Sequence, residues 1–440
     1  MIPTVLGPVE PLSVEGSCSA HEYLRCKPLP ADIEVAHQNP LTLANLSDVR
    51  SCGDDGRFSV SNKLFSLDES AQELAALADA GGALVVECTT VGHGRDPGGL
   101  VEISRRSNVG VVMAASWRRV RATIESEAKP LPNAETIGRE LERQLLFGEH
   151  VDGAAHQASK TQMRVPTRVQ AGVIVVELGD RYSSCKDLAE TPSGIADETV
   201  RALEGAGWAQ RATSAPLIIV FHHFVRWEIV ESAFAIATAQ LGGDATPGKI
   251  ILAGMHGGVT QCLHDHLAML AKGVVLCFDC FGRVEWLPGP EYYPADEESA
   301  VRIAELARQG FARQIVMSQG VSRRIHLSRF GGHGYGHALR TVPSRLRRLG
   351  MSEDEIALTT RGTMLRLLDW YTPPPPLEPP KEYLPCSWCK NAFEPVAGEY
   401  FHKFQFVYCG MKCLRLHRDT GFDAARVGGM ELATTSDRRG

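Results

Sequence analysis

The sequence lacks a long apolar run, an excess of basic charge and a basic segment followed by an apolar one at its start. No apolar run approaches the roughly 18 residues that span a bilayer, so we expect no membrane contact. The net charge of −6 and the pI near 6.2 give no support for binding nucleic acid by bulk electrostatics, and we expect no nucleic-acid partner. The opening residues, MIPTVLGPVEPLSVEG, do not have the pattern of a signal peptide.

The cysteines do not form the pattern of a disulfide framework, which is typical of small secreted chains. The chain has 440 residues and 12 cysteines, of which four cluster near the C-terminus and the others lie singly or in pairs. This distribution suits a reducing compartment, and we expect a cytoplasmic protein. A hydrophobic content of 44% in this length is enough for one large domain and a small module.

Buried strands and helices alternate along the chain. Residues 67–120 read as a helix, a Gly-Gly break, an apolar strand, a glycine loop, a second helix and a second strand, which is the alternation of a parallel sheet. Residues 313–339 begin with the apolar run Ile315 to Met317 and then turn polar. A buried strand that delivers polar residues at its C-terminal end is typical of a (β/α)₈ TIM barrel, an α/β fold.

Two segments carry a resemblance to a known family. Residues 329–337, RFGGHGYGH, closely resemble the loop after the last barrel strand of phosphotriesterase-related proteins, in the amidohydrolase superfamily. Residues 83–97, ALVVECTTVGHGRDP, resemble the second strand of that family and the loop behind it. The resemblance covers about residues 1–371 and implies a metal-dependent hydrolase. It places the following residues in a loop at the pocket: Gly331, Gly332, His333, Tyr335 and His337.

The resemblance also shows what the site has lost. The family's first strand ends in T-H-E-H, with two metal-binding histidines, whereas this strand ends in Ala20, His21, Glu22 and Tyr23. Tyr23 cannot replace an imidazole as an ordinary zinc ligand. In the family the last strand ends in an Asp that binds metal and acts as general base. Counting back without gaps from Gly331 puts that Asp on Gly320.

The remaining metal ligands are displaced. Glu177 matches the carboxylate that bridges two metals in relatives when the strand is aligned on Leu178, but it falls one position late when aligned on Gly172. A slip by one residue turns a side chain to the other face, so only a bulge restores its inward direction.

Two histidines lie two residues beyond the family's histidine positions. Those positions fall on Val220 and Gly254, and the histidines beyond them are His222 and His256. We expect both to point at the barrel opening, although the choice between His222 and His223 stays open. A reduced site for a divalent metal would draw on four residues: His21, Glu177, His222 and His256.

The chain breaks at a proline-rich spacer, residues 372–384, because runs of proline adopt extended polyproline geometry. Beyond it, residues 385–420 hold a CxxC pair and a CxxxC pair with nineteen residues between them. This spacing predicts a structural zinc site with four thiolate ligands: Cys386, Cys389, Cys409 and Cys413. The pattern resembles treble-clef zinc fingers, which usually bind protein partners. We expect residues 421–440 to form a flexible tail.

Two functions fit these features. In the first, a degenerate phosphotriesterase-like barrel is kept as a scaffold, a pseudoenzyme, and the zinc finger is its protein-interaction module. This hypothesis accounts for the simultaneous loss of Asp and histidine from the metal site. In the second, a zinc-dependent hydrolase acts on an ester, lactone, amide or phosphoester through a reduced metal site. We favour the first, because a fold does not guarantee its ancestral function.

Overall fold

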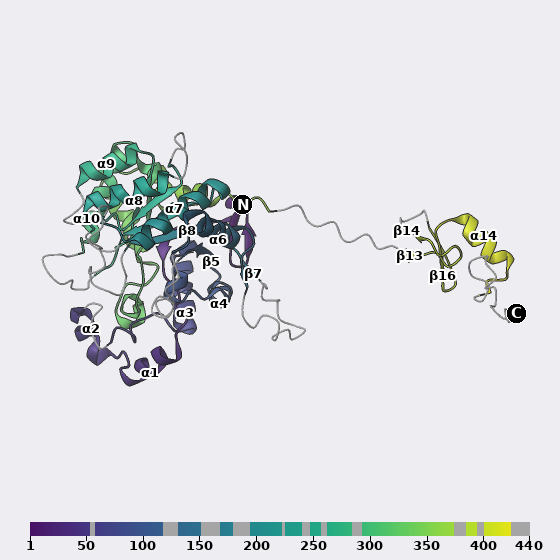
Figure 1. The fold of residues 1–440 in the computed structure, drawn as a ribbon. Coiled ribbons are helices and arrows are strands. Elements are labelled where there is room, and N and C mark those ends of the chain that lie inside the picture. The colour runs from purple at the N-terminus through teal and green to yellow at the C-terminus, as the bar shows by residue number, and fades with distance from the viewer. Residues whose placement is uncertain are drawn as a thin grey trace. The chain divides into compact units, whose positions relative to one another are not determined.

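The computed structural model describes residues 1–52, 58–117, 131–150, 168–178, 194–221, 225–239, 247–256, 262–283, 293–373, 384–393 and 400–423. The chain divides into two compact units, Met1–Thr372 and Pro373–Gly440 (Figure 1). The boundary between the units thus falls one residue after position 371. Most of the proline-rich spacer (374–383) and most of the tail (424–440) lie outside the described residues.

The first unit is built on eight parallel strands whose order in the sheet is their order in the chain. Apart from the first strand, SCSAHE, they are largely apolar, because both faces of each strand are covered. The strands are β3 (Ser17–Glu22), β4 (Gly82–Glu87), β5 (Gly110–Ala115), β8 (Ala171–Leu178), β9 (Leu217–Phe221), β10 (Ile250–Ala253), β11 (Val275–Phe278) and β12 (Ile315–Met317). They form a nearly closed barrel, which confirms the predicted (β/α)₈ fold.

Helices surround these strands (Figure 1). Each buries an apolar stripe on the sheet and exposes a polar face. They are α3 (Leu67–Asp79), α4 (Pro97–Ser107), α6 (Ala134–Leu146), α7 (Asp197–Thr213), α8 (Trp227–Ala239), α9 (Leu263–Ala271), α10 (Asp296–Arg308) and α11 (His337–Arg348). The excursion between β3 and α3 contains α1 (Pro30–Gln38) and α2 (Leu46–Cys52). A second small pairing joins β6 (Glu149–His150) to β7 (Arg168–Val169).

Short elements cover the N-terminal face of the barrel. The hairpin of β1 (Ile2–Thr4) and β2 (Gly7–Val9) leads into a 3₁₀ turn at Pro11–Ser13. On the same face the chain after α11 forms α12 (Glu353–Ala357), a π-helical turn (Leu358–Gly362) and α13 (Thr363–Leu368). The indole of Trp370 donates a hydrogen bond of 2.8 Å to the carbonyl of Gly172, which ties the end of this segment to β8.

The barrel closes between its two edge strands through a buried carboxylate. Glu22, at the end of β3, is fully buried and accepts hydrogen bonds from the amides of Gln319 (2.8 Å) and Val321 (2.7 Å). The hydroxyls of Ser19 and Ser318 lie 2.7 and 2.6 Å from the same carboxylate. Burial raises the pKa of Glu22, and these hydrogen bonds lower it again in part. Four donors from both edges therefore converge on one side chain.

The second unit is a small zinc-finger-like fold. Two short hairpins, β13 (Leu384–Pro385) with β14 (Ala392–Phe393) and β15 (Phe401–Lys403) with β16 (Phe406–Tyr408), precede α14 (Met411–Asp419). His417 is fully buried at its centre, with Nδ1 2.9 Å from the Tyr408 hydroxyl. Within the described residues of both units, no helix has the length and apolar character needed to cross a membrane.

Replacing Glu22 by Ala should destabilise the barrel by about 3 kcal/mol, because it strands buried donors from both edge strands. Urea unfolding followed by near-ultraviolet circular dichroism measures the change. Glu15→Ala, an exposed carboxylate two residues before β3, is the matched control and should leave the barrel transition unchanged. Equal midpoints for the two variants would contradict the closing role of Glu22.

Candidate functional site

A chain of hydrogen bonds crosses the C-terminal mouth of the barrel. The Nδ1 atom of His21 lies 2.6 Å from Oδ2 of Asp279, which directly follows β11. The Nε2 atom of His21 lies 3.0 Å from the hydroxyl of Tyr23, and that hydroxyl donates a 2.9 Å hydrogen bond to Glu177. All four side chains are almost fully buried. A tyrosine hydroxyl therefore lies between two side chains that the resemblance assigns to metal binding.

Glu177 points into the mouth because β8 contains an irregularity. Met113 pairs with Ala171, but the next residue of β5, Ala114, pairs with Val173. The register therefore shifts at Gly172, where a Cβ atom would lie 2.8 Å from the carbonyl of Pro3. An extra residue in one strand is a β-bulge, and it reverses which face the following side chains occupy. The bulge that the sequence required for an inward Glu177 is present.

The second oxygen of Glu177 is bound from the loop after β4. Its Oε2 atom lies 2.9 Å from Nδ1 of His93 and accepts a hydrogen bond of 3.3 Å from the hydroxyl of Thr90. The two loop side chains also contact each other at 2.9 Å. This carboxylate thus has three polar neighbours, as a buried carboxylate requires.

Glycines occupy two positions at which the family has metal ligands. Gly254 has a φ of 86°, and a Cβ there would collide with the carbonyl of Phe221; its amide donates to both oxygens of Asp279, at 3.1 and 3.0 Å. Gly320 has a φ of 59°, and a Cβ there would lie 2.6 Å from the carbonyl of Asp279. The family's carboxylate cannot be restored at Gly320 without moving the neighbouring strand end. Asp279 supplies a carboxylate to His21 from the adjacent strand instead.

Burial alone would raise the pKa of Asp279, but the hydrogen bond and the charge of His21 outweigh it and hold the pKa below its usual value. Asp279 is therefore ionised at neutral pH. Burial lowers the pKa of His256, which keeps this imidazole neutral, and the charge of Arg283 acts in the same direction.

One small cavity lies among the described residues of the mouth. A cavity of about 40 Å³ is lined by His21, Tyr23, His256, Asp279, Arg283 and Arg323, with apolar and glycine residues completing the wall. The guanidinium group of Arg283 donates to the carbonyl of Gly320 and lies against His326. A volume of this size holds a few water molecules, whereas sites for small-molecule ligands usually measure about 300–1,000 Å³.

The predicted pocket loop packs behind the network. The Tyr335 hydroxyl donates to the carbonyl of Tyr23 at 2.7 Å, and His337 Nε2 lies 2.6 Å from Asp296 on α10. His333 lies against His337 with ring centroids 4.2 Å apart. Gly331 and Gly332 form the tight turn of this loop. Arg50 stabilises the turn by donating hydrogen bonds to the carbonyls of Phe330 and Gly331. These residues do not line the cavity; they hold the backbone of the strand that carries Tyr23.

Metal-binding geometry occurs in the second unit. Of all groups of His, Cys, Asp and Glu side chains within the described residues, only the four cysteines of the finger place their ligand atoms within 4.8 Å of one another. His222 and His223 lie outside the described residues, so their directions are not assigned. His21, Glu177 and His256 are at the mouth, but they are engaged in the network or its wall and do not converge as a ligand set.

The cysteine geometry fits zinc. The Sγ atoms of Cys389 and Cys413 each lie 3.7 Å from that of Cys409. Four sulfurs at about 2.3 Å from one ion in a tetrahedron would be about 3.8 Å apart. Burial tends to raise the pKa of Cys386, but hydrogen bonds from the amides of Cys409, Cys389 and Trp388 lower it to about 7. The thiolate is the form that binds metal.

Comparison with known proteins gives the family of each unit. Residues 2–363 match the phosphotriesterase family, and residues 381–425 match the Vms1-associating treble clef domain. The chain belongs to the phosphotriesterase family. The treble-clef match confirms the predicted fold of the C-terminal module.

Within the phosphotriesterase family the chain is similar to N-acetyltaurine hydrolase of Tetraodon nigroviridis, with 27% identity over 369 residues that cover 81% of this chain and 94% of that protein. A phosphotriesterase-related protein of Aedes aegypti is 25% identical over 357 residues, covering 78% and 91%. Among solved structures, a resiniferatoxin-binding protein from Rhodobacter sphaeroides superimposes with a TM-score of 0.65 and 25% identity, covering 84% of this chain and 94% of that one.

Sequence reasoning missed Asp279, His93 and Arg283. Asp279 directly follows the apolar run of β11, so the rule that polar residues at strand ends face the mouth would have found it. His93 lies between two glycines in the loop after β4, and glycines in such a loop indicate a turn rather than a binding site. Arg283 had no signal in the sequence, because its contact with Gly320 depends on the left-handed backbone there.

The finger should carry one zinc ion per chain. Cys386→Ser or Cys413→Ser should abolish that zinc and unfold residues 385–420, because the ion supplies most of the folding energy of so small a module. The barrel should melt nearly as before. Zinc per chain is measured by inductively coupled plasma mass spectrometry, with Cys262→Ser, an exposed thiol of the barrel, as the control. Stoichiometric zinc in both finger variants would refute the ligand set.

Proposed function

We propose that the barrel is a non-catalytic scaffold and that the treble-clef module binds a protein partner. The observation that carries this proposal is the position of the Tyr23 hydroxyl, hydrogen-bonded to both His21 and Glu177. Two side chains that the family resemblance assigns to metal binding thus have the Tyr23 hydroxyl as a common hydrogen-bond partner. Because the groups are already paired, metal binding would first have to break buried hydrogen bonds.

The size of the cavity supports the same proposal. Among the described residues of the mouth, the cavity beside His21 measures about 40 Å³, far below the usual volume of a small-molecule site. Asp279, the one carboxylate beside His21, is engaged by the Gly254 amide as well. General-base catalysis requires a proton acceptor that can reach the attacking water. Both oxygens of this carboxylate already accept hydrogen bonds.

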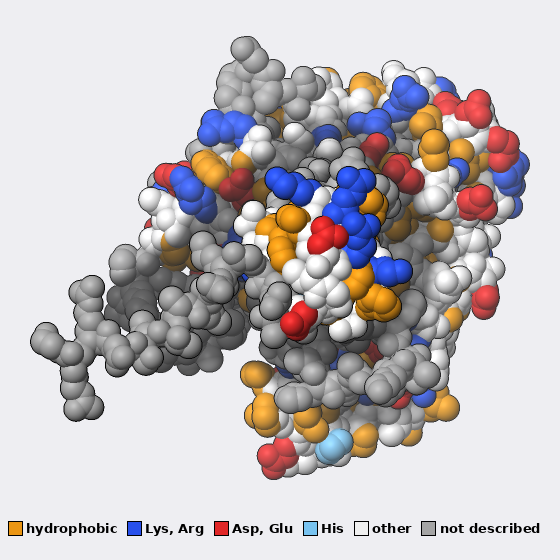
Figure 2. Space-filling model, turned by 90° about the vertical axis from the view of Figure 1, so that its right-hand side faces the viewer, with side chains coloured by type: hydrophobic (Ala, Val, Ile, Leu, Met, Phe, Trp, Pro, Cys, Tyr) orange, Lys and Arg blue, Asp and Glu red, His pale blue; other side chains and the backbone are white. Residues whose placement is uncertain are grey.

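The treble-clef module has an exposed aromatic residue in an unusual conformation. Phe404, at the tip of the β15–β16 hairpin, is 69% exposed and has a φ of 53°. Two-residue hairpin turns favour asparagine or glycine at such positions, and a bulky residue there is strained. The strain is typical of functional sites. In this hairpin the Nζ atom of Lys403 lies 5.2 Å from the centroid of the Phe404 ring. Figure 2 shows one face of the molecule, on which Lys and Arg side chains lie beside hydrophobic ones.

We infer that Phe404 is an anchor for the protein partner. The description of the matching domain names Vms1, which makes Vms1 the first partner to test. We place the protein in the cytoplasm, because the distribution of its cysteines along the chain suits a reducing compartment.

The hydrolase is the second candidate, favoured by the relatives that carry the name N-acetyltaurine hydrolase. For this activity His21, His256 and the ionised Asp279 would have to release their present contacts and converge on one metal ion. Three protein ligands and a water are a common catalytic set. The two candidates differ in whether zinc-dependent turnover depends on His21.

We predict no zinc-dependent turnover of N-acetyltaurine, lactones or phosphotriesters by the full chain. A curated N-acetyltaurine hydrolase, assayed in parallel, is the positive control. Tyr23→His should restore an imidazole beside His21, and a second zinc per chain in this variant would show that Tyr23 is what blocks the metal. Turnover by the unchanged protein that is lost in His21→Ala would establish the hydrolase instead.

Purified Vms1 should bind the full chain through the treble-clef module, and Phe404→Asn should weaken this binding at least about tenfold. Asparagine tolerates a positive φ, so the variant should keep its zinc and its thermal stability while losing the aromatic anchor. Isothermal titration calorimetry measures the affinity, and Leu43→Asn, an exposed leucine of the barrel, is the control. Unchanged affinity in Phe404→Asn would remove the residue from the interface.

A further inference from the structure

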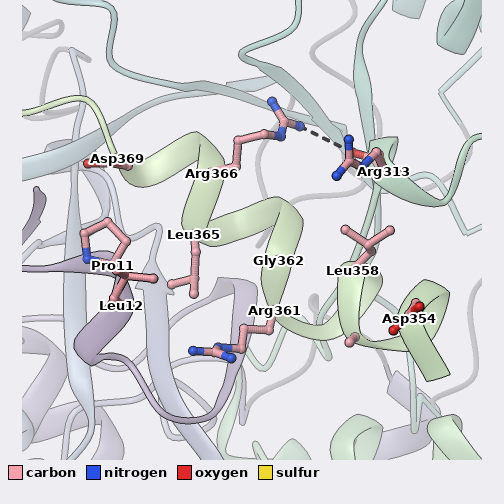
Figure 3. Close-up of a pocket in the computed structure, with 11 residues that line it drawn as sticks. Pro11, Leu12, Arg313, Asp354, Leu358, Arg361, Gly362, Leu365, Arg366 and Asp369 are labelled. Atoms are coloured by element: carbon pink, nitrogen blue, oxygen red, sulfur yellow. Dashed lines mark hydrogen bonds between the residues drawn. The ribbon is translucent and has the colours of Figure 1, made fainter.

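The N-terminal face of the barrel holds a pocket far larger than the cavity at the mouth. It measures about 600 Å³ and lies between the 3₁₀ turn at Pro11–Ser13 and the α12–α13 segment (Figure 3). The chemistry of this fold is confined to the opposite, C-terminal face. A large pocket here therefore has no part in the site described above.

The pocket is lined by apolar side chains that solvent reaches. Leu12 is 92% exposed, the highest value among the large hydrophobic side chains of the described residues. Leu358, Leu365 and Pro11 also line the pocket, and Figure 3 shows Leu365 extending from the helix toward Leu12. A single exposed leucine needs no explanation, but an exposed leucine at the edge of an apolar pocket is typical of an interaction site.

Three arginines surround these leucines without carboxylate partners. In the described part of the chain, Arg366 and Arg361 donate hydrogen bonds to the carbonyls of Arg313 (3.3 Å) and Val14 (2.5 Å), and none of the three arginines forms an ion pair. The Nε atom of Arg361 is buried without a hydrogen-bond acceptor among the described residues. Burial and the neighbouring charge of Arg313 lower the pKa of Arg366. Among the described residues, the three guanidinium groups therefore form no ion pair.

Two carboxylates also line the pocket. Asp369, just after α13, lies 2.7 Å from the terminal ammonium group of Met1 and so is already paired. Asp354, in α12, lies one helical turn before Leu358. The turn between α12 and α13, Leu358–Gly362, is π-helical, and such local distortions of a helix are frequent at functional sites. Gly362 also lines the pocket, and because it has no side chain it takes up no space there.

We propose that this pocket binds an acidic peptide segment of a partner protein that carries leucine-like side chains. The apolar floor accepts the aliphatic side chains, and the arginines pair with carboxylates. A peptide fits better than a small molecule, because small ligands are mostly enclosed by their pockets whereas Leu12 projects into solvent. The site lies on the barrel itself and goes beyond the proposed function, since it depends neither on zinc in the finger nor on the state of the mouth.

The test uses the full chain and a short fluorescein-labelled peptide of glutamate and leucine, followed by fluorescence anisotropy. Two companion peptides replace glutamate by lysine or leucine by alanine. We expect saturable binding of the acidic leucine peptide only, weakened by salt because the charges are exposed. The double variant Leu12→Asp with Arg366→Glu should bind at least about tenfold more weakly. Its matched control, Leu43→Asp with Arg211→Glu, introduces the same changes at exposed sites outside the pocket and should bind like the parent.

Three outcomes would overturn the proposal. The first is the absence of saturable binding of the acidic leucine peptide. The second is equal binding to the pocket variant and its control, or binding of the lysine peptide with the same affinity. The third is a dimer of the unchanged chain in sedimentation velocity that the pocket variant abolishes, which would make a second copy of this chain the occupant. Because Cys386→Ser removes the finger's zinc without touching this pocket, unchanged peptide binding in that variant separates the proposal from the function assigned to the finger.

Discussion

The mouth of the barrel depends on one hydroxyl group, that of Tyr23. A binuclear metal site gathers anionic and neutral ligands around positive charge, and without the ion those ligands would be buried and unsatisfied. Here the Tyr23 hydroxyl contacts Nε2 of His21 and donates to Glu177, while Asp279 contacts Nδ1 of His21. Every member has a partner of opposite polarity, and a network of this kind is stable only when it is complete. A tyrosine at position 23, where the family resemblance places a histidine, therefore changes the hydrogen-bond partners of the whole site.

The surrounding structure is fitted to this network. Gly254 permits its amide to approach Asp279, and the bulge at Gly172 turns Glu177 inward. The hydroxyl of Tyr335 fixes the backbone at Tyr23, and Glu22 joins the strand that carries His21 to the last strand. Two buried carboxylates, Glu22 and Asp279, thus act through hydrogen bonds to backbone amides. The polar residues at this end of the barrel hold strand ends together, a task that remains when catalysis is absent.

The sequence predicted the barrel because eight apolar runs and their intervening helices are local patterns with distinct periods. It predicted the cysteine group of the finger because metal-ligand spacing is also local. It did not predict the partner of His21, because Asp279 is 258 residues away and reaches it only through the closure of the barrel. The direction of Glu177 stayed open for a related reason: the bulge at Gly172 depends on the close approach of Pro3 and Val112, which no pattern in the strand reveals.

The two ends of a barrel have different constraints, and this chain treats them in opposite ways. Among the described residues of the C-terminal end, His21, Tyr23, Glu177 and Asp279 pair with one another. The N-terminal end, which normally serves stability, leaves Arg313, Arg361 and Arg366 without ion pairs in the described part of the chain, beside the exposed Leu12. Exposed guanidinium groups beside an exposed leucine can give a partner both ion pairs and apolar contacts. This combination is why we place the proposed peptide-binding site at the N-terminal face of the barrel.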